Sequence, residues 1–344
     1  MKRGNNMKYA VISDIHGNSE ALKATIASAI ENKCTGFVFL GDYGTDFPGI
    51  HEVLAMVRWC QQNYPTYVIK GNREEYILEY LNGSHPDWEN NPTKKIIMSD
   101  IVSLSEEDKE FIRSLSSAAI VNLPNIGKVA ISHSINLNAE IKEAINTGEI
   151  KTVLFGHSHT AGTWHSGSCD YYNPGSVGLS KDGTTSTYAI LEQRENKIYF
   201  DIKVVNYDIE KENELIDSKP ELSGPSAAYI AELTKMSMAV GRPMSIYFFG
   251  ELHRLNAIYK KAQETNSEPD YSPLDESIEK TYILLSGISI DSNNNIMPSI
   301  DIDIRQTYPF SNNKMDINNL RDYHVDYLEF NYDSVPNELI PIAF

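Results

Sequence analysis

The chain of 344 residues carries 30 basic and 47 acidic side chains, which gives a formal net charge of −17 at neutral pH and a pI near 4.9. Broad binding of nucleic acid or of anionic membranes requires clustered Lys and Arg, so this charge balance argues against both partners. The acidic charge balance does not exclude a small phosphorylated substrate that is held through metal ions. The length allows one large domain, or a domain of ordinary size with a smaller companion.

The three cysteines, Cys34, Cys60 and Cys169, are too few and too far apart for a disulfide framework or a CxxC metal pair, so we expect reduced thiols. No apolar stretch approaches the length of a membrane span, and the N-terminal MKRGNN lacks the apolar core of a signal peptide. We therefore expect a cytoplasmic protein with no membrane partner.

From residue 9 to residue 72, short apolar runs rich in β-branched residues alternate with two helical stretches, 19–32 and about 50–63. The three runs are YAVIS, GFVFLGD and TYVIKGN. Apolar residues recur at helical spacing in the second helical stretch. This βαβαβ pattern predicts parallel strands that are buried on both faces.

Each of these three strands is followed by polar residues: Asp14 and His16, then Asp42, then Asn72. Ligands bind at that edge of open α/β sheets. Alternation along an extended chain places Asp14 and His16 on one face, where a carboxylate and an imidazole together suit Mn, Fe, Zn or Ni. The alternative is that Asp14 caps the helix beginning near Ser19, beside a solvated histidine. The pair by itself does not decide between these interpretations.

Residues 73–81 are expected to form a short helix, and residues 82–117 form an insertion beside the site, with helices near 93–103 and 106–115. The insertion fits either a lid or a passive decoration. Strands are expected at 119–123 and 128–132, the second ending in His133, and at 152–155, ending in His157 and His159. Further strands are expected near 162–165, 186–191 and 197–205, and the turn-rich NPGSVG lies between the first two of these.

After residue 206 the composition changes, and we expect a small α+β appendage. Helices are expected at about 226–240 and 246–265, and strands near 281–290, 296–308 and 324–332. We therefore divide the chain into a domain of residues 7–206 and an accessory region of residues 207–344. The candidate roles of that region are to join subunits, to shield the site or to recognise substrate.

Five strand-like runs together deliver seven potential metal ligands to one edge. Two adjacent divalent ions need one ligand set each and a shared anionic oxygen, and a carboxylate suits that bridge because both of its oxygens carry lone pairs. Asp42 is the natural bridge. The seven residues are Asp14, His16, Asp42, Asn72, His133, His157 and His159.

The ordered set DIHGN, GDYG, GNRE, SHS, GHSH and NPGSVG resembles the calcineurin-like metallophosphoesterase superfamily, in particular its small bacterial phosphodiesterase branch, over about residues 7–205. The resemblance implies an α/β fold, a four-layer α/β/β/α sandwich. It also implies a dinuclear metal-dependent phosphodiesterase for a small soluble phosphoester, in which a metal-bridging hydroxide attacks phosphorus. Manganese is the expected metal, with Fe, Zn, Ni and Mg as alternatives.

The resemblance also implies a role for each motif residue. One ion is held by Asp14, His16 and His159, the other by Asn72, His133 and His157, and Asp42 bridges them. Asp42, Asn72, Arg73 and His133 are the residues expected to take part in catalysis.

Arg73 departs from the family pattern, since many relatives have histidine there, in GNHD or GNHE, which is thought to assist the leaving group or to steady the phosphate. Arginine stays charged near neutral pH and does not give up its proton, but its fork can grip phosphoryl oxygens. The alternative is that Arg73 is a surface residue at a helix N-terminus, paired with Glu74 or Glu75.

Other functions stay open at this stage. A nucleotide phosphomonoesterase would use the same metal core. A protein phosphatase is less well supported, because GDYGTDF and GNRE replace the usual GDxxDRG and GNHE. A non-catalytic scaffold for a protein partner would be expected to have lost metal ligands, and all of them are present.

Three further residues are weaker candidates for the site: Asp46, Tyr43 and Asn173. Acidic residues in loops are usually solvated, tyrosines often cover sheet edges, and Asn-Pro-Gly is first of all a turn signal.

Overall fold

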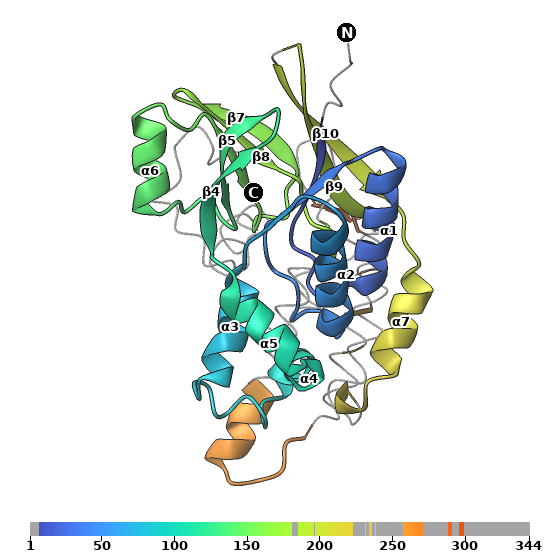
Figure 1. The fold of residues 1–344 in the computed structure, drawn as a ribbon. Coiled ribbons are helices and arrows are strands. Elements are labelled where there is room, and N and C mark those ends of the chain that lie inside the picture. The colour runs from blue at the N-terminus through green and yellow to red at the C-terminus, as the bar shows by residue number, and fades with distance from the viewer. Residues whose placement is uncertain are drawn as a thin grey trace.

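The structure is a computed structural model that describes residues 7–180, 185–195, 197–222 and 257–270, together with the short segments 231, 234–235, 238, 288–290 and 296–298. Two five-stranded sheets lie face to face, and helices cover the outer face of each sheet (Figure 1). The predicted four-layer α/β/β/α sandwich is confirmed.

The first sheet has the strand order β10-β9-β1-β2-β3. Its parallel half is the predicted βαβαβ unit: β1 (Lys8–Ile12), α1 (Ser19–Glu31), β2 (Gly36–Phe39), α2 (Ile50–Asn63) and β3 (Thr66–Val68). The two helices lie side by side on the outer face of this sheet (Figure 1). The carboxyl ends of its three parallel strands therefore meet at one edge.

The other half of the first sheet is antiparallel. β9 (Ser186–Arg194) pairs with β1, and β10 (Lys197–Val205) pairs with β9. Successive residues of a strand point to opposite faces, so Ile12 packs beneath the helices, whereas Tyr9 and Val11 face the second sheet.

The second sheet has the order β4-β5-β6-β8-β7. Its strands are β4 (Ala118–Leu123), β5 (Gly127–Ser132), β6 (Thr152–Phe155), β7 (Gly162–Ser166) and β8 (Cys169–Asn173). The sequence analysis does not predict β8, a five-residue run with charged and aromatic residues that becomes a strand by pairing with β6 and β7. β5, β6 and β8 run parallel, so their carboxyl ends meet at one edge as well.

Helix α6 (Ala139–Asn146) covers the outer face of the second sheet and was also not predicted. Between the sheets, Val129, Ile131 and Leu154 pack against residues of β1 and β2. This apolar layer holds the two sheet edges, and therefore the polar residues that follow the strands, in a fixed relationship.

The insertion is helical, as predicted: α3 (Asn72–Leu81) precedes it, and it contains α4 (Lys95–Ser103) and α5 (Glu106–Ser114). It is not a separate layer. Its apolar residues join the core that α1 and α2 form on the first sheet; they are Trp88, Ile97, Ile101, Leu104 and Ile112.

After β10, helix α7 (Ile209–Asp217) contacts α1 and lies beside it in Figure 1. Residues 257–264 are helical, within the predicted helix 246–265, and β11 (Ile288–Ile290) pairs with β12 (Ile296–Pro298). The predicted strand 324–332 and most of the predicted helix 226–240 lie outside the described residues. The division of the chain after residue 206 stays a prediction. In the part of the chain that the structure describes, no helix is both long and apolar enough to span a bilayer.

Candidate metal centre

All seven predicted ligands meet where the strands of both sheets end. Asp14 and His16 follow β1, Asp42 follows β2, and the remaining four follow β3, β5 and β6; they are Asn72, His133, His157 and His159. The packing of one sheet on the other therefore brings two sets of strand ends to a single place.

The backbone at these positions is unusual. Five of the seven residues have positive φ: Asp14 (55°), His16 (57°), Asp42 (57°), His157 (69°) and His159 (56°). Such conformations cost roughly 1–3 kcal/mol each for residues other than glycine, and they persist where the surrounding structure enforces them. At these positions the backbone leaves the extended conformation of the strands, and such conformations cluster at functional sites.

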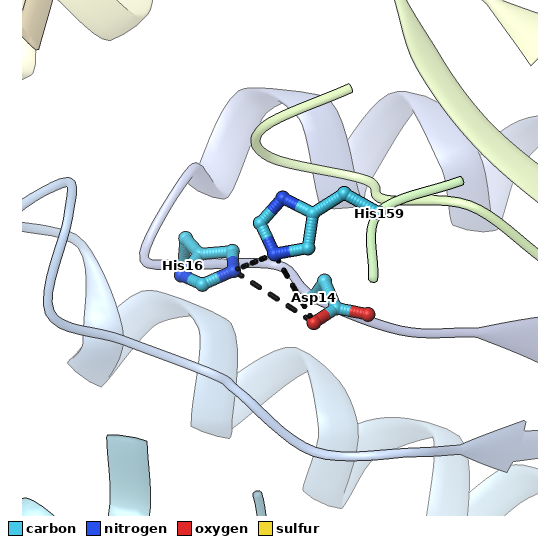
Figure 2. A group of neighbouring side chains, drawn as sticks. All are labelled: Asp14, His16 and His159. Carbon is cyan, nitrogen blue, oxygen red and sulfur yellow. Dashed lines mark hydrogen bonds and ion pairs between the residues drawn. The ribbon is translucent and has the colours of Figure 1, made fainter. Parts of the chain in front are cut away.

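Asp14, His16 and His159 form the first group of candidate ligands. Nε2 of His16 lies 2.9 Å from Nε2 of His159, and Oδ1 of Asp14 lies 3.3 Å from the His159 nitrogen and 3.9 Å from the His16 nitrogen. Figure 2 shows the two ring nitrogens and the carboxylate oxygen converging on one point. All three side chains are buried.

Asp42, His133 and His157 form the second group, with Asn72 beside them. Oδ1 of Asn72 lies 2.9 Å from Nε2 of His133 and 3.1 Å from Nδ1 of His157, and these two ring nitrogens are 3.2 Å apart. Oδ2 of Asp42 lies 3.3 Å from Nε2 of His133. The asparagine amide oxygen thus joins the group as the sequence analysis expects.

The ring nitrogens that point away from the groups have partners of their own. Nδ1 of His16 is 2.6 Å from a carboxylate oxygen of Asp46, and Nδ1 of His133 and of His159 lie 2.8 Å and 3.0 Å from the backbone carbonyls of Leu40 and Leu179. In the neutral imidazole, the outer nitrogen donates its N–H to this oxygen, and the lone pair that could bind a metal then lies inward at Nε2. Converging nitrogen lone pairs and carboxylate oxygens fit a divalent cation in each group.

The titration behaviour agrees with a site built for positive charge. Burial favours the neutral form of His133, but the Asp42 carboxylate outweighs it and raises the pKa of His133 to about 9. Burial favours the protonated form of Asp14, but His159 and His133 outweigh it and lower the pKa of Asp14 to about 2. The carboxylates of the centre are therefore ionised at neutral pH.

A model of the calcineurin-like phosphoesterase superfamily domain matches residues 7–196. This chain belongs to that superfamily. The match spans every predicted ligand and the insertion. The superfamily is one of divalent-metal-dependent phosphoesterases, a class of hydrolases that act on ester bonds.

Individual relatives of this calcineurin-like phosphoesterase are distant. A protein of Methanocaldococcus jannaschii, named as uncharacterised, is 29% identical and is aligned over 60% of this chain and 90% of its own length. A hypothetical protein from Pyrococcus horikoshii shares the fold with a TM-score of 0.53 at 18% identity, covering 65% of this chain and 97% of that protein. A metallophosphoesterase from Sphaerobacter thermophilus is 22% identical with a TM-score of 0.49, over 66% and 99% of the two chains.

Arg73 lies beside the candidate metal centre. Its Nη2 is 3.4 Å from Asp46 and its Nε is 3.9 Å from Asp42, and its side chain is 23% exposed. The two acids considered as surface partners are engaged elsewhere: Glu75 pairs with Lys70, and Glu74 accepts backbone hydrogen bonds. Burial acts against the charged form of Arg73, but Asp46 and Asp42 outweigh it and raise its pKa, so the guanidinium stays charged.

Two residues contact the candidate ligands although the sequence analysis gave them little weight: Asp46 and Glu74. Asp46 is buried rather than solvated, and burial, which favours its protonated form, is outweighed by Arg73 and His16, which lower its pKa to about 2. Glu74, fully buried at the start of α3, accepts hydrogen bonds from the backbone N–H groups of Asp42 (2.9 Å), Tyr43 (2.7 Å) and Gly71 (2.7 Å). Glu74 is the last residue of GNRE and the third residue of α3, a position where acids often cap the helix, and this spacing was the sequence signal for its role.

The other weak candidates have structural roles. The hydroxyl of Tyr43 is buried and donates to the carbonyl of Ile69 at 2.7 Å. Nδ2 of Asn173 donates to the carbonyl of Gly156 at 2.8 Å and lies 3.1 Å from Oγ of Ser158, so it holds the GHSH loop. Gly156 itself is required, because a Cβ there would collide with Ser13.

Proposed function

We propose that this superfamily member is a dinuclear metal-dependent phosphodiesterase that acts on a small soluble substrate. The position of Asp42 supports the two-metal assignment, because its Oδ2 lies 3.3 Å from His133 in one group and 3.9 Å from His16 in the other. A carboxylate oxygen between two sets of converging ligands suits a bridge. We assign Asp14, His16 and His159 to one ion and Asn72, His133 and His157 to the other, with Asp42 shared.

Two divalent ions bound there would neutralise charge on the phosphoryl oxygens and lower the pKa of a nearby water toward neutrality. Manganese suits the mixed oxygen and nitrogen donors, and we propose it as the native metal. The protein holds this charge in place through buried groups: the backbone N–H of Arg73 donates to Oδ1 of Asp42 at 2.9 Å, and the backbone N–H of His157 donates to Asp14 at 2.9 Å. These bonds fix the orientation of both carboxylates in the site.

Arg73 supplies the phosphate contact. Among the residues that the structure describes, its buried Nε finds no hydrogen-bond partner, although buried donors are normally paired. A phosphoryl oxygen beside Asp42 would satisfy that donor with a charge-assisted hydrogen bond. Because the guanidinium does not release its proton, we expect the leaving group to be a good one or to take its proton from water.

A cavity of about 280 Å³ beside the second group supports a diester rather than a monoester. A monoester has one organic substituent, whereas a diester has two, and this cavity offers the second one a place. Hydroxyl, amide and amino groups line it beside apolar surface, so we propose a substituent that carries hydroxyl groups. The lining residues outside the candidate ligands include Lys70, Ser117, Ser132, Ser134, Asn136 and Asn138.

The test uses full-length protein stripped of metal and resupplied with Mn²⁺, with bis(4-nitrophenyl) phosphate beside 4-nitrophenyl phosphate and with Asp42→Asn as the control. Preferential cleavage of the diester, lost in Asp42→Asn, is the expected result. Preference for the monoester would overturn the diester assignment in favour of a nucleotide phosphomonoesterase or protein phosphatase. Metal binding without cleavage of either ester would favour the scaffold.

A further inference from the structure

We propose that Asp46 is a positioning residue for the metal ligand His16, and that the helical insertion of residues 82–117 acts on the metal centre through Asp46. The proposal rests on the metal-binding part of the proposed function but not on the choice of substrate. It assigns the insertion a role that is neither a lid nor a passive decoration.

The first step is the contact between Asp46 and His16. Oδ2 of Asp46 lies 2.6 Å from Nδ1 of His16, and both residues are buried. A carboxylate at Nδ1 fixes that nitrogen as the protonated one, which leaves Nε2 free to donate its lone pair to a metal. The same contact fixes the rotation of the ring, and Nε2 then lies 2.9 Å from Nε2 of His159.

The second step is the loop that carries Asp46. Its backbone wraps around His16, because the N–H groups of Asp46 and Phe47 both donate to the His16 carbonyl, at 3.3 Å and 2.7 Å. Thr45 in this loop has φ of 89°, a conformation that is a clear outlier for a β-branched residue. The loop therefore needs support from outside itself to stay in this shape.

Asp100 of α4 provides that support. Its carboxylate is fully buried and accepts hydrogen bonds from the backbone N–H groups of Thr45 at 2.6 Å and Ile50 at 3.3 Å. Gly44 makes the approach feasible, since a Cβ at that position would lie 2.8 Å from Oδ2 of Asp100. The Asp100 carboxylate of the insertion thus holds the backbone of Thr45, which is next to Asp46, and of Ile50, the first residue of α2.

The third step is the rigidity of α4 itself. Ile97 and Ile101 lie on either side of Asp100 in the sequence and are buried in the core beneath α1 and α2. A packed helix of this kind holds its side chains in one position. The contacts form a continuous series. The packed core holds α4 and its Asp100, Asp100 holds the backbone of Thr45, and the neighbouring Asp46 contacts Nδ1 of His16.

The insertion also contains a matched control. Asp108, at the start of α5, is as buried as Asp100, but it bonds Nδ1 of His51 at 2.7 Å and Nη1 of Arg58 at 2.5 Å, both on α2. Asp108 therefore fastens the insertion to the body of the protein without touching the Thr45–Asp46 loop. Loss of either acid should lower stability, but only loss of Asp100 should disturb the metal centre.

The experiment measures metal binding rather than turnover, so it stays informative even if no ester is hydrolysed. Metal-free full-length protein is titrated with Co²⁺ and followed by visible absorption, and thermal unfolding of each variant is recorded in parallel. For Asp46→Asn we expect a loss of affinity of about 10- to 100-fold in one of the two sites, the range typical of a residue that orients a metal-bound histidine. Asp100→Asn should weaken the same site by a smaller factor, and Asp108→Asn should lower the melting temperature with unchanged affinity.

Nuclear magnetic resonance of ¹⁵N-histidine-labelled, Zn²⁺-loaded protein adds a readout that a purely structural role would not move. His16 should carry its proton on Nδ1, and this signal should shift or exchange faster in Asp46→Asn while the other histidines keep theirs. Asp46→Glu, which keeps a carboxylate, should recover part of the affinity, and it replaces Asp46→Asn if that variant does not fold.

Wild-type cobalt affinity and an unshifted His16 signal in the Asp46 variants would overturn the positioning role. Equal affinities in Asp100→Asn and Asp108→Asn would overturn the link to the insertion. Failure of the proposed function has a different signature, because wild-type protein would then bind two cobalt ions without cleaving a diester, or would bind none.

Discussion

Oδ2 of Asp42 lies 3.9 Å from Nε2 of His16, although the two residues belong to different groups of candidate ligands. Asp42 lies just after β2, with φ of 57°. Two hydrogen bonds fix it between the groups: its backbone N–H donates to Glu74, and its Oδ1 accepts from the backbone N–H of Arg73. This single contact joins the two groups into one candidate dinuclear centre.

Replacing the shared carboxylate should therefore affect both ions at once. In Asp42→Asn we expect both metal affinities to fall and turnover of a chromogenic diester to drop by more than about 100-fold, because an amide offers one neutral oxygen where the carboxylate offers two charged ones. Isothermal titration with Mn²⁺ and a steady-state assay measure the two effects. Full activity with two bound ions would rule out the bridging assignment.

Arg73→His should leave metal binding nearly unchanged and alter the pH profile of kcat/KM. A histidine titrates near neutral pH and can protonate a leaving group, whereas arginine stays charged. We expect a new limb in the profile at about pH 6–7 and a gain of about tenfold or more on esters with poor leaving groups. Identical profiles and substrate ranges for the two proteins would argue against any contact between Arg73 and substrate.

Filling the cavity beside the second group should separate diesters from monoesters. In Ser134→Trp we expect KM for a diester to rise by about tenfold while kcat/KM for a small monoester changes less than about twofold, since only the diester places a substituent there. The exposed Ser84→Trp serves as the control for adding an indole elsewhere. A parallel loss on both esters would show that the cavity does not select the substituent.

Stability should depend on pH through Glu212 of α7, whose Oε2 accepts hydrogen bonds from Oγ of Ser19 at 3.2 Å and the backbone N–H of Glu20 at 3.0 Å. Burial raises the pKa of Glu212 from 4.5 to about 7, against the opposing effect of these hydrogen bonds. The native state therefore holds this proton more tightly than the unfolded state. The resulting stabilisation is present below pH 4.5 and is lost as the pH rises through about 7.

Glu212→Gln should remove this dependence. Relative to wild type, the variant should gain about 1–3 kcal/mol in its free energy of unfolding between about pH 5 and about pH 8, as measured by urea denaturation at both values. A constant difference between the two proteins at every pH would show that Glu212 titrates normally.

The seven candidate ligands lie together where the sequence analysis expected them, because the signals that place them are local. Each apolar run that ends in Asp, Asn or His forms a strand whose carboxyl end lies at the site, and a parallel sheet brings such ends together by its own geometry. The two insertion helices were also predicted from the sequence, near 93–103 and 106–115. The short elements β8 and α6 carry too few residues for such periodicity to emerge, and only their packing partners make them regular.

The case of Asp46 shows where local signals end. An acid in a Gly- and Thr-containing loop is usually solvated, and nothing adjacent to it in the sequence predicts otherwise. The decisive partner of its neighbour Thr45 is Asp100, 55 positions further along the chain. Likewise, Arg73 contacts Asp42 and Asp46 of the candidate metal centre rather than Glu74, because Glu74 accepts hydrogen bonds from the backbone after β2.

The sequence by itself thus determined the α/β class, the family and the set of candidate metal ligands, since each depends on residue type and spacing within one strand-loop-helix unit. Only the tertiary structure decided how far apart the candidate ligands lie, which outer groups contact them and which residues the insertion contacts. Those relationships depend on distances between segments far apart in the chain. The packing of the two sheets, and the insertion core on α1 and α2, set these distances.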